Sequence, residues 1–240
     1  MTERFPDVSG LLLKGPPGVG KLEWSLELIR HSLKEGKKVV VVCVDYPPEA
    51  IKERALKFNI NLGEREGKDL VFIDCVTLSL SNVREGTPSR GTIYVTSLSN
   101  IEGIGMSISK AANQLGGSPD LFFYSLSPLF LHNSSSVLMK FFQIVMSKLR
   151  NWQGFGVFAL HDGAEEGATD TLAMMADGVV EMRFKPNLQR EMRIHHIKGV
   201  TTSPKWVQFD IGGEFLDVVL TERGPGLEFL SEREVADESL

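Results

Sequence analysis

The feature that most limits what this chain can fold into is a glycine-rich segment, ended by a lysine, close to its start. It follows the short apolar run Leu11–Lys14 and precedes Leu22–Lys34, whose apolar residues recur at helical spacing. The order of residues fits G-x-x-x-x-G-K, in which backbone N–H groups and a helix start surround a phosphate group and the lysine reaches its oxygens. A glycine-rich turn that binds nothing is the alternative, but strand, loop, lysine and helix signals coincide here. The segment predicts a nucleotide-binding loop made of Gly15, Pro16, Pro17, Gly18, Val19, Gly20, Lys21 and Leu22.

One position in this segment departs from the usual pattern. The residue after the lysine is normally Ser or Thr, whose hydroxyl binds Mg²⁺. Leu22 has no side-chain oxygen, so a metal ion here needs another ligand or more water. ATP or ADP is the expected ligand, Mg²⁺ is left open, and no residue is assigned to a metal site.

The rest of the chain alternates short apolar runs with helical patterns, which predicts a parallel sheet covered by helices on both faces. A stretch rich in Ser, Thr and Gly, residues 77–99, is expected to be a long loop, and residues 190–220 are expected to form antiparallel hairpins. We therefore predict one three-layer α/β domain over residues 1–230, with hairpins extending one sheet edge and a polar tail at 231–240. The predicted strands are Lys38–Val44, Leu70–Val76, Leu121–Leu126, Gly156–Leu160 and Gly178–Phe184, and the predicted helices after the first are Glu49–Phe58, Asn100–Leu115 and Ser136–Trp152.

Composition and charge exclude several classes of partner. The chain has 26 Lys and Arg against 31 Asp and Glu, a formal net charge of −5, so it has no overall attraction for nucleic acid or anionic membranes. No apolar run reaches the roughly 18 residues that span a bilayer, and the charged start has no signal-peptide core. Cys43 and Cys75 lie in apolar, strand-like runs and are expected to be buried rather than bridged. We expect a cytoplasmic protein with neither nucleic acid nor membrane as a partner.

Beyond the loop, the sequence resembles the KaiC-like branch of the RecA superfamily of ATPases. The resemblance covers roughly residues 8–220 and lies in the order of its motifs, each of which is weak by itself. It implies a RecA-like fold, ATP as ligand, and self-association into a ring of about six subunits or a dimer, with a protein partner also open. The matching segments are CVDYPPEAIKERALKFNINL, LVFIDC, PDLFFYSLSPLFL, GFGVFALHDG through MADGVVEMRF, and IHHIKGVTTSPKWVQFDIGGEFLDV.

The family's catalytic positions match this sequence unevenly. Where the resemblance implies a Walker B aspartate that holds Mg²⁺, the chain has Tyr124-Ser125. Where it implies a pair of acids that orient the attacking water, the chain has Asp45 and then Tyr46. Asp45 is therefore a candidate residual base, although a carboxylate that caps the turn at Pro47-Pro48 explains it equally well. For Tyr124, a ring half-buried at a strand end is the simpler interpretation.

Three further residues are assigned from the same resemblance. His161 occupies the position of a residue that senses the terminal phosphate, while an Asp-Gly turn after a strand is the alternative explanation. His196 and Lys198 match the stretch that reaches a neighbouring subunit's nucleotide. A zinc site at His195-His196 is not expected, because adjacent residues of a strand point to opposite faces.

These departures affect metal binding and water activation, on which phosphoryl transfer depends. We therefore predict a nucleotide-binding regulatory or signalling protein with weak or absent hydrolysis. The alternative is an assembly module that no longer binds nucleotide. An active DNA-dependent ATPase is disfavoured by the acidic charge and the missing Walker B carboxylate.

Overall fold

The structure is a computed structural model that describes residues 9–80, 91–163, 166–199, 201–202 and 205–211. In that part of the chain, nine strands form one sheet in the order β4-β3-β2-β5-β6-β1-β7-β8-β9. Neighbours from β4 to β7 run parallel, whereas β7, β8 and β9 pair antiparallel at one edge. The strands are β1 (Gly10–Gly15), β2 (Val39–Cys43), β3 (Leu70–Asp74), β4 (Thr92–Tyr94), β5 (Asp120–Tyr124), β6 (Gly156–His161), β7 (Gly178–Phe184), β8 (Arg190–Ile197) and β9 (Val207–Phe209).

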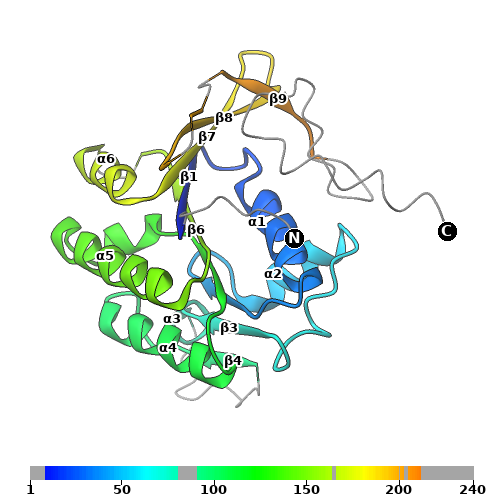
Figure 1. Ribbon diagram of the computed structural model, residues 1–240, viewed down its shortest axis with the longest axis vertical. Helices are drawn as coiled ribbons and strands as arrows, with labels where there is room; N and C mark the ends of the chain where they lie inside the picture. The colour runs from blue at the N-terminus through cyan, green and yellow to red at the C-terminus, as the bar shows by residue number, and fades with distance from the viewer. Residues whose placement is uncertain (1–8, 81–90, 164–165, 200, 203–204, 212–240) are drawn as a thin grey trace.

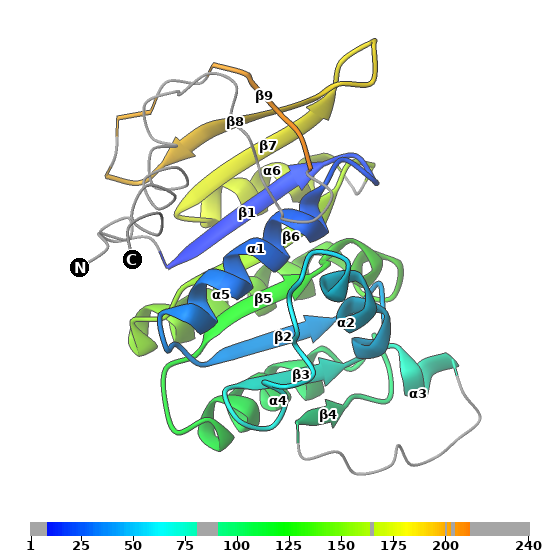
Figure 2. The same ribbon diagram turned by 90° about the vertical axis from the view of Figure 1, so that its right-hand side faces the viewer.

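Helices cover both faces of the sheet, so the domain has three layers (Figure 1). In Figure 2, α1 and α2 lie in front of the strands, and α4 and α5 lie behind them. The helices are α1 (Lys21–Lys34), α2 (Pro48–Leu56), α3 (Thr77–Leu80), α4 (Ile101–Gln114), α5 (Ser135–Trp152) and α6 (Glu166–Met175), with a 3₁₀ turn, η1, at Ser127–Leu131.

Strand β2 shows why unbroken apolar runs predicted central strands. Val39 and Val41 pack into the core beneath α1 and α2, while Val40 and Val42 pack into the core beneath α4 and α5. Because successive side chains of a strand point to opposite faces, a strand with a core on each side needs an apolar residue at every position. The predicted three-layer domain with a mostly parallel sheet and antiparallel hairpins is confirmed.

The segment predicted to be one long loop, residues 77–99, is partly regular in the described residues. It contains the short helix α3 and the edge strand β4, whose Ile93 pairs with Ile73 of β3. All three residues of β4 are partly exposed, so this edge strand lacks the buried apolar pattern by which central strands are recognised. The part of the predicted hairpins beyond residue 211 and the polar tail at 231–240 lie outside the described residues.

The sheet order fixes where a ligand can bind. Strand β1 lies between β6 and β7, and the parallel strands β1, β2, β5 and β6 end at the same edge of the sheet. In open α/β sheets, ligands bind at the carboxyl ends of such strands. The glycine-rich segment connects the end of β1 to α1 and therefore lies at this edge.

Candidate nucleotide-binding site

The glycine-rich loop needs glycine at two turning points. Gly18 has φ 77° and Gly20 has φ 116°, both in the left-handed region that residues with a Cβ rarely adopt. Gly20 is also crowded, since a Cβ there would lie 2.6 Å from the Cδ1 atom of Ile211, just after β9. The sequence thus places glycine where the backbone turns, and the chain after β9 packs against the loop.

Lys21 is the first residue of α1, and its long side chain folds back into the loop. Its Nζ donates hydrogen bonds to the carbonyl oxygens of Gly15 and of Pro16, the latter at 2.7 Å. Only 2% of the residue is exposed. Burial lowers the pKa of Lys21 to about 8, while the carboxylates of Asp162 and Asp45 act in the opposite direction. The ammonium is therefore held where the resemblance places a phosphate-binding lysine.

Leu22 follows as the second residue of the helix. It is partly buried and packs against the hydrophobic core beneath α1 and α2. Its side chain contributes packing, so its backbone N–H is the group that it can offer to a phosphate.

The positions expected to hold metal and activate water lie together at the ends of β2, β5 and β6. Asp45 follows β2, Tyr124 ends β5 and His161 ends β6. The Nε2 atom of His161 lies 2.9 Å from the Oδ2 atom of Asp45. Because β5 lies between β2 and β6, this pair extends across the end of the strand that carries Tyr124. Two residues with separate predicted roles therefore form one interacting pair.

Tyr124 occupies the place of the expected Walker B carboxylate with an aromatic ring. Its ring lies edge-on to His161, with centroids 5.9 Å apart, and stacks on Tyr46 at 6.1 Å. Burial, together with the nearby Asp45 carboxylate, raises the pKa of the Tyr124 hydroxyl well above its ordinary value. The phenol stays neutral at physiological pH, so it supplies no anionic oxygen for a cation.

His161 is held from two sides. Its backbone N–H donates a 2.7 Å hydrogen bond to the Ser127 hydroxyl in η1, and its ring contacts Asp45. The other ring nitrogen, Nδ1, is buried and has no hydrogen-bond partner in the described part of the chain. The Asp-Gly turn that offered an alternative explanation is also present, with Gly163 at φ 94°.

One charged side chain at this edge escaped the sequence interpretation, and a second belongs to the Asp-Gly turn that was expected after His161. Glu23, in the first turn of α1, is buried and accepts a 2.9 Å hydrogen bond from Nε of Arg54 in α2. The backbone N–H of Asp162 donates to the carbonyl of Gly15 at 3.1 Å. An acidic residue in a first helical turn is a recognisable signal, but no sequence pattern pairs Glu23 with an arginine on another helix.

His196 and Lys198 lie near the amino-terminal ends of β7 and β1, whereas the loop follows the carboxyl end of β1. The end of β8 pairs with the beginning of β7, where Gly178 faces Ile197. The backbone N–H of Lys198 donates to the carbonyl of Asp177 at 2.7 Å, just before β7. These two residues therefore cannot touch a phosphate in the loop of their own domain, and their role toward a neighbouring subunit stays a prediction.

The expectation that His195 and His196 point apart is wrong. The pairing of β7 with β8 shifts between Val179 and Val180, and this bulge interrupts the alternation of side chains. The two rings lie 5.7 Å apart in an edge-on arrangement. Within the described residues, no three His, Cys, Asp or Glu side chains gather as a potential metal site.

The fold and the loop define a P-loop domain of the RecA type. A solved structure, the KaiC-like protein of the hyperthermophilic archaeon Pyrococcus horikoshii OT3, has a similar fold, with a TM-score of 0.66. The two proteins are 16% identical over 87% of this chain and 88% of the other, so the likeness concerns the fold.

The sequence profile of the KaiC ATPase family matches residues 1–223, and the chain belongs to this family. No curated protein matches the sequence at a significant level. Membership of an ATPase family implies nucleotide binding in general, and domains of this kind commonly oligomerise. None of the helices in the described residues is long and apolar enough to cross a membrane.

Proposed function

We propose that this chain is a KaiC-like regulatory or signalling protein that binds ATP and hydrolyses it weakly or not at all. The observation that carries the proposal is a contrast within one site. The loop keeps its glycines and a buried Lys21, whereas Tyr124 and the Asp45–His161 pair stand where metal and water would be held.

Binding rests on groups that this chain retains. The loop from Gly15 to Leu22 offers backbone N–H groups, and the start of α1 adds its partial positive charge. Phosphate oxygens would take over the hydrogen bonds that Lys21 now gives to the carbonyls of Gly15 and Pro16. Exchanging neutral carbonyl partners for anionic oxygens adds the Coulombic attraction between opposite charges, which is stronger at a buried site than in water.

Hydrolysis needs groups that this chain lacks. Phosphoryl transfer depends on a Mg²⁺ ion and a positioned water rather than on covalent chemistry by the protein. Leu22 and Tyr124 offer no metal ligand, and Asp45 is engaged with His161. Removing a single electrostatic group of this kind costs roughly 10²–10³ in rate, so the combined departures support very slow turnover.

A second candidate is an assembly module that has lost nucleotide binding. It is favoured by the fact that the Lys21 ammonium is already satisfied by two loop carbonyls and that Ile211 abuts Gly20. Both candidates share a single domain at 1–230, a cytoplasmic location, and self-association as a ring of about six subunits or a dimer. In either assembly, His196 and Lys198 would face the neighbouring subunit.

The test is calorimetric titration of the purified protein with ATP, once with Mg²⁺ and once with a chelator. A separate sample of the purified protein is denatured and the released small molecules are analysed, which shows whether a nucleotide is already bound. We expect binding with similar affinity under both conditions. A large loss of affinity in chelator would show that metal is held by some other route, and no binding at all would favour the assembly module.

A further inference from the structure

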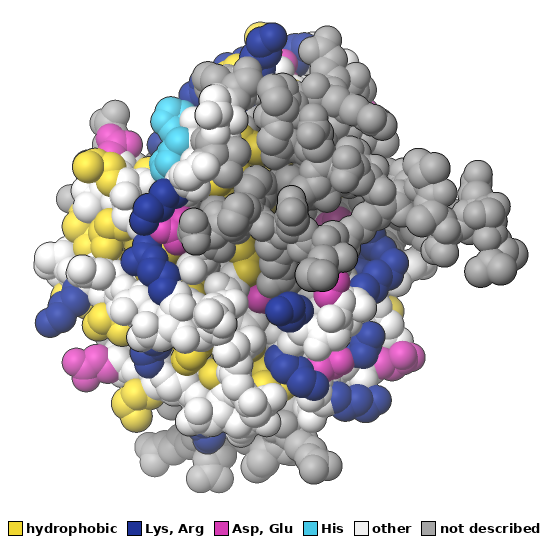
Figure 3. All heavy atoms as spheres, in the orientation of Figure 1, with side chains coloured by type: hydrophobic (Ala, Val, Ile, Leu, Met, Phe, Trp, Pro, Cys, Tyr) yellow, Lys and Arg dark blue, Asp and Glu magenta, His cyan; other side chains and the backbone are white. Residues whose placement is uncertain are grey.

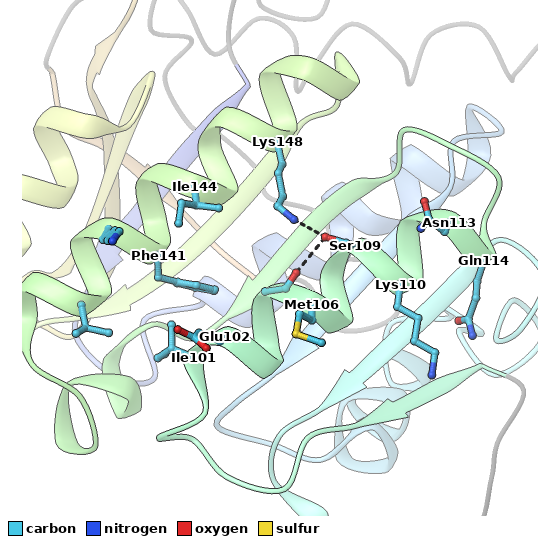
Figure 4. Close-up of a pocket in the computed structure, with 13 residues that line it drawn as sticks. Ile101, Glu102, Met106, Ser109, Lys110, Asn113, Gln114, Phe141, Ile144 and Lys148 are labelled. Atoms are coloured by element: carbon cyan, nitrogen blue, oxygen red, sulfur yellow. Dashed lines mark hydrogen bonds between the residues drawn. The ribbon is translucent and has the colours of Figure 1, made fainter.

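A groove lies on the outer surface of the domain, between α4 and α5, on the sheet face opposite α1 and α2 (Figure 4). Its volume is about 950 Å³. Phe141 lies at its floor, and Met106, Val137 and Ile144 line it. The exposed fractions of these last three residues are 72%, 45% and 46%.

This apolar surface is not required by the fold. The buried face of α4, with Ile104 and Ile108, packs against the sheet, so Met106 projects away from the core. Figure 3 shows hydrophobic side chains exposed on the left of the molecule, where Figure 1 places α4, α5 and α6. Contiguous exposed apolar surface with a polar rim marks an interaction site.

The rim of the groove is positively charged. Lys110, Lys140 and Lys148 line it, with Glu102 as the one acidic residue among the lining side chains. Lys148 donates a hydrogen bond to Ser109. Among the described residues, no carboxylate lies within ion-pair distance of these three lysines, whereas the chain as a whole carries −5. The groove therefore fits an occupant that is apolar on one side and acidic around it.

The chain itself contains a segment of this composition, residues 226–240. It follows the part that matches the family profile, which ends at residue 223. Its apolar residues are Leu227, Phe229, Leu230, Val235, Ala236 and Leu240, and its charged residues are Glu228, Glu232, Arg233, Glu234, Asp237 and Glu238. Five acids against one arginine give this segment a charge opposite to that of the groove.

We propose that the groove between α4 and α5 binds the acidic segment 226–240 of a second copy of this chain. The described chain ends at Ile211, which packs against the core on the α1 side of the sheet. The groove lies on the opposite face of the sheet from Ile211, so we assign the segment to the groove of a neighbouring copy rather than to that of its own. This contact does not depend on nucleotide binding, so it holds or fails separately from the proposed function.

The first test measures binding of a fluorescent peptide of residues 226–240 to protein that lacks these residues. We expect the double charge reversal Lys110→Glu with Lys140→Glu, and separately Ile144→Asp, to weaken binding about tenfold or more, the factor that corresponds to about 1.4 kcal/mol. Matched controls are Lys57→Glu and Leu56→Asp, which alter an exposed lysine and an exposed leucine at the end of α2, on the other face. Peptide binding should be unchanged in these controls. A peptide with amides in place of its five acids should bind more weakly.

The second test separates a second copy from the same copy. Protein that lacks residues 226–240 has a groove and no segment, and full-length Ile144→Asp has a segment and a damaged groove. Neither should associate alone through this contact, but their mixture should gain mass over either protein alone in light scattering, with the largest gain at a one-to-one ratio. Full-length protein with the five acids changed to amides should lose the same association without any deletion.

Each other outcome overturns the proposal. Peptide binding combined with a mixture that gains no mass over either protein alone would show that the segment occupies its own groove. Equal peptide binding by the groove variants and the α2 controls would place the contact elsewhere. No peptide binding by the tailless protein would show that the groove serves a different partner.

Discussion

The two halves of the candidate nucleotide site differ in the kind of group that they would offer to a ligand. The loop from Gly15 to Lys21 relies on backbone N–H groups, glycine conformations and one ammonium. The opposite half, at the ends of β2, β5 and β6, relies on side chains, and there the chain has Asp45, Tyr124 and His161. A loop that binds phosphate through backbone N–H groups tolerates many substitutions around it. A metal site, in contrast, is lost when one or two of its ligand oxygens are removed. Binding and hydrolysis are therefore separable in this fold, and the comparison predicts which substitutions affect each.

The largest expected effect comes from removing the one charged group of the loop. In Lys21→Ala, ATP affinity should fall by about 2–5 kcal/mol, a factor between about 30 and several thousand, because the phosphates lose their buried cation. Calorimetric titration measures the change, with Lys37→Ala, an exposed lysine just beyond α1, as the control. An unchanged affinity in Lys21→Ala would mean that the nucleotide binds elsewhere.

The second-largest expected effect concerns the rate of hydrolysis and the half of the site at the ends of β2, β5 and β6. We expect the unmodified protein to release phosphate far below the roughly 1 per second typical of enzymes. Restoring oxygen ligands and the base together, with Leu22→Thr, Tyr46→Glu and Tyr124→Asp, should raise the rate about 10²-fold or more. Each single replacement should gain little, because the other two positions still limit the step.

That experiment needs a check on folding. Tyr124 is 8% exposed, so Tyr124→Asp places a carboxylate where it has to find a partner or remain unpaired. Circular dichroism and a thermal melt show whether the triple variant is folded before its rate is read. Robust, Lys21-dependent turnover by the unmodified protein would show that the catalytic positions are assigned incorrectly.

A smaller effect is expected from the pair that joins β2 to β6. Asp45→Asn removes the carboxylate beside His161 and should lower the free energy of unfolding by about 1–3 kcal/mol, since it weakens a largely buried hydrogen bond. Urea unfolding measures the change, with Asp170→Asn, an exposed aspartate on α6, as the control. If Asp45 only stabilises the fold, the residual phosphate release per folded molecule should not change; a further drop would make it the residual base.

The smallest effect is a dependence on pH. Burial lowers the pKa of Lys21 to about 8 from 10.5, so between these values the unfolded chain binds more protons than the folded one. The free energy of unfolding therefore rises with pH across this window and does not change through Lys21 below it. Bound phosphates favour the charged lysine, so ATP binding at pH 8.5 should take up a fraction of a proton. Titrations in two buffers of different ionisation enthalpy measure the uptake, and Lys21→Ala should abolish it.

Patterns of nearby residues were enough to predict most of the fold. The run at 38–44 became β2 because burial on both faces requires apolar residues at every position. The edge strand β4 was missed because all three of its residues are partly exposed. The bulge opposite Val179 was missed because it depends on pairing between strands rather than on the strand itself.

The candidate site likewise has a part that the sequence predicts and a part that it does not. The loop is contiguous in sequence, so its glycines and Lys21 can be named from the order of residues alone. The contact of Asp45 with His161 joins residues 116 positions apart, and the one between Glu23 and Arg54 joins two helices. Sequence reasoning placed Asp45 and His161 at strand ends, but it could not show that the two form a pair.

The position of β1 in the sheet has a consequence for how the protein is made. The glycine-rich motif is synthesised first, yet β1 is flanked by β6 and β7, which begin at Gly156 and Gly178. Ile211, which abuts Gly20, leaves the ribosome later still. A nascent chain that stops before Gly156 carries the entire motif but neither of the strands that flank β1. Such long-range pairing folds slowly, so nucleotide can stabilise this domain only near the end of translation.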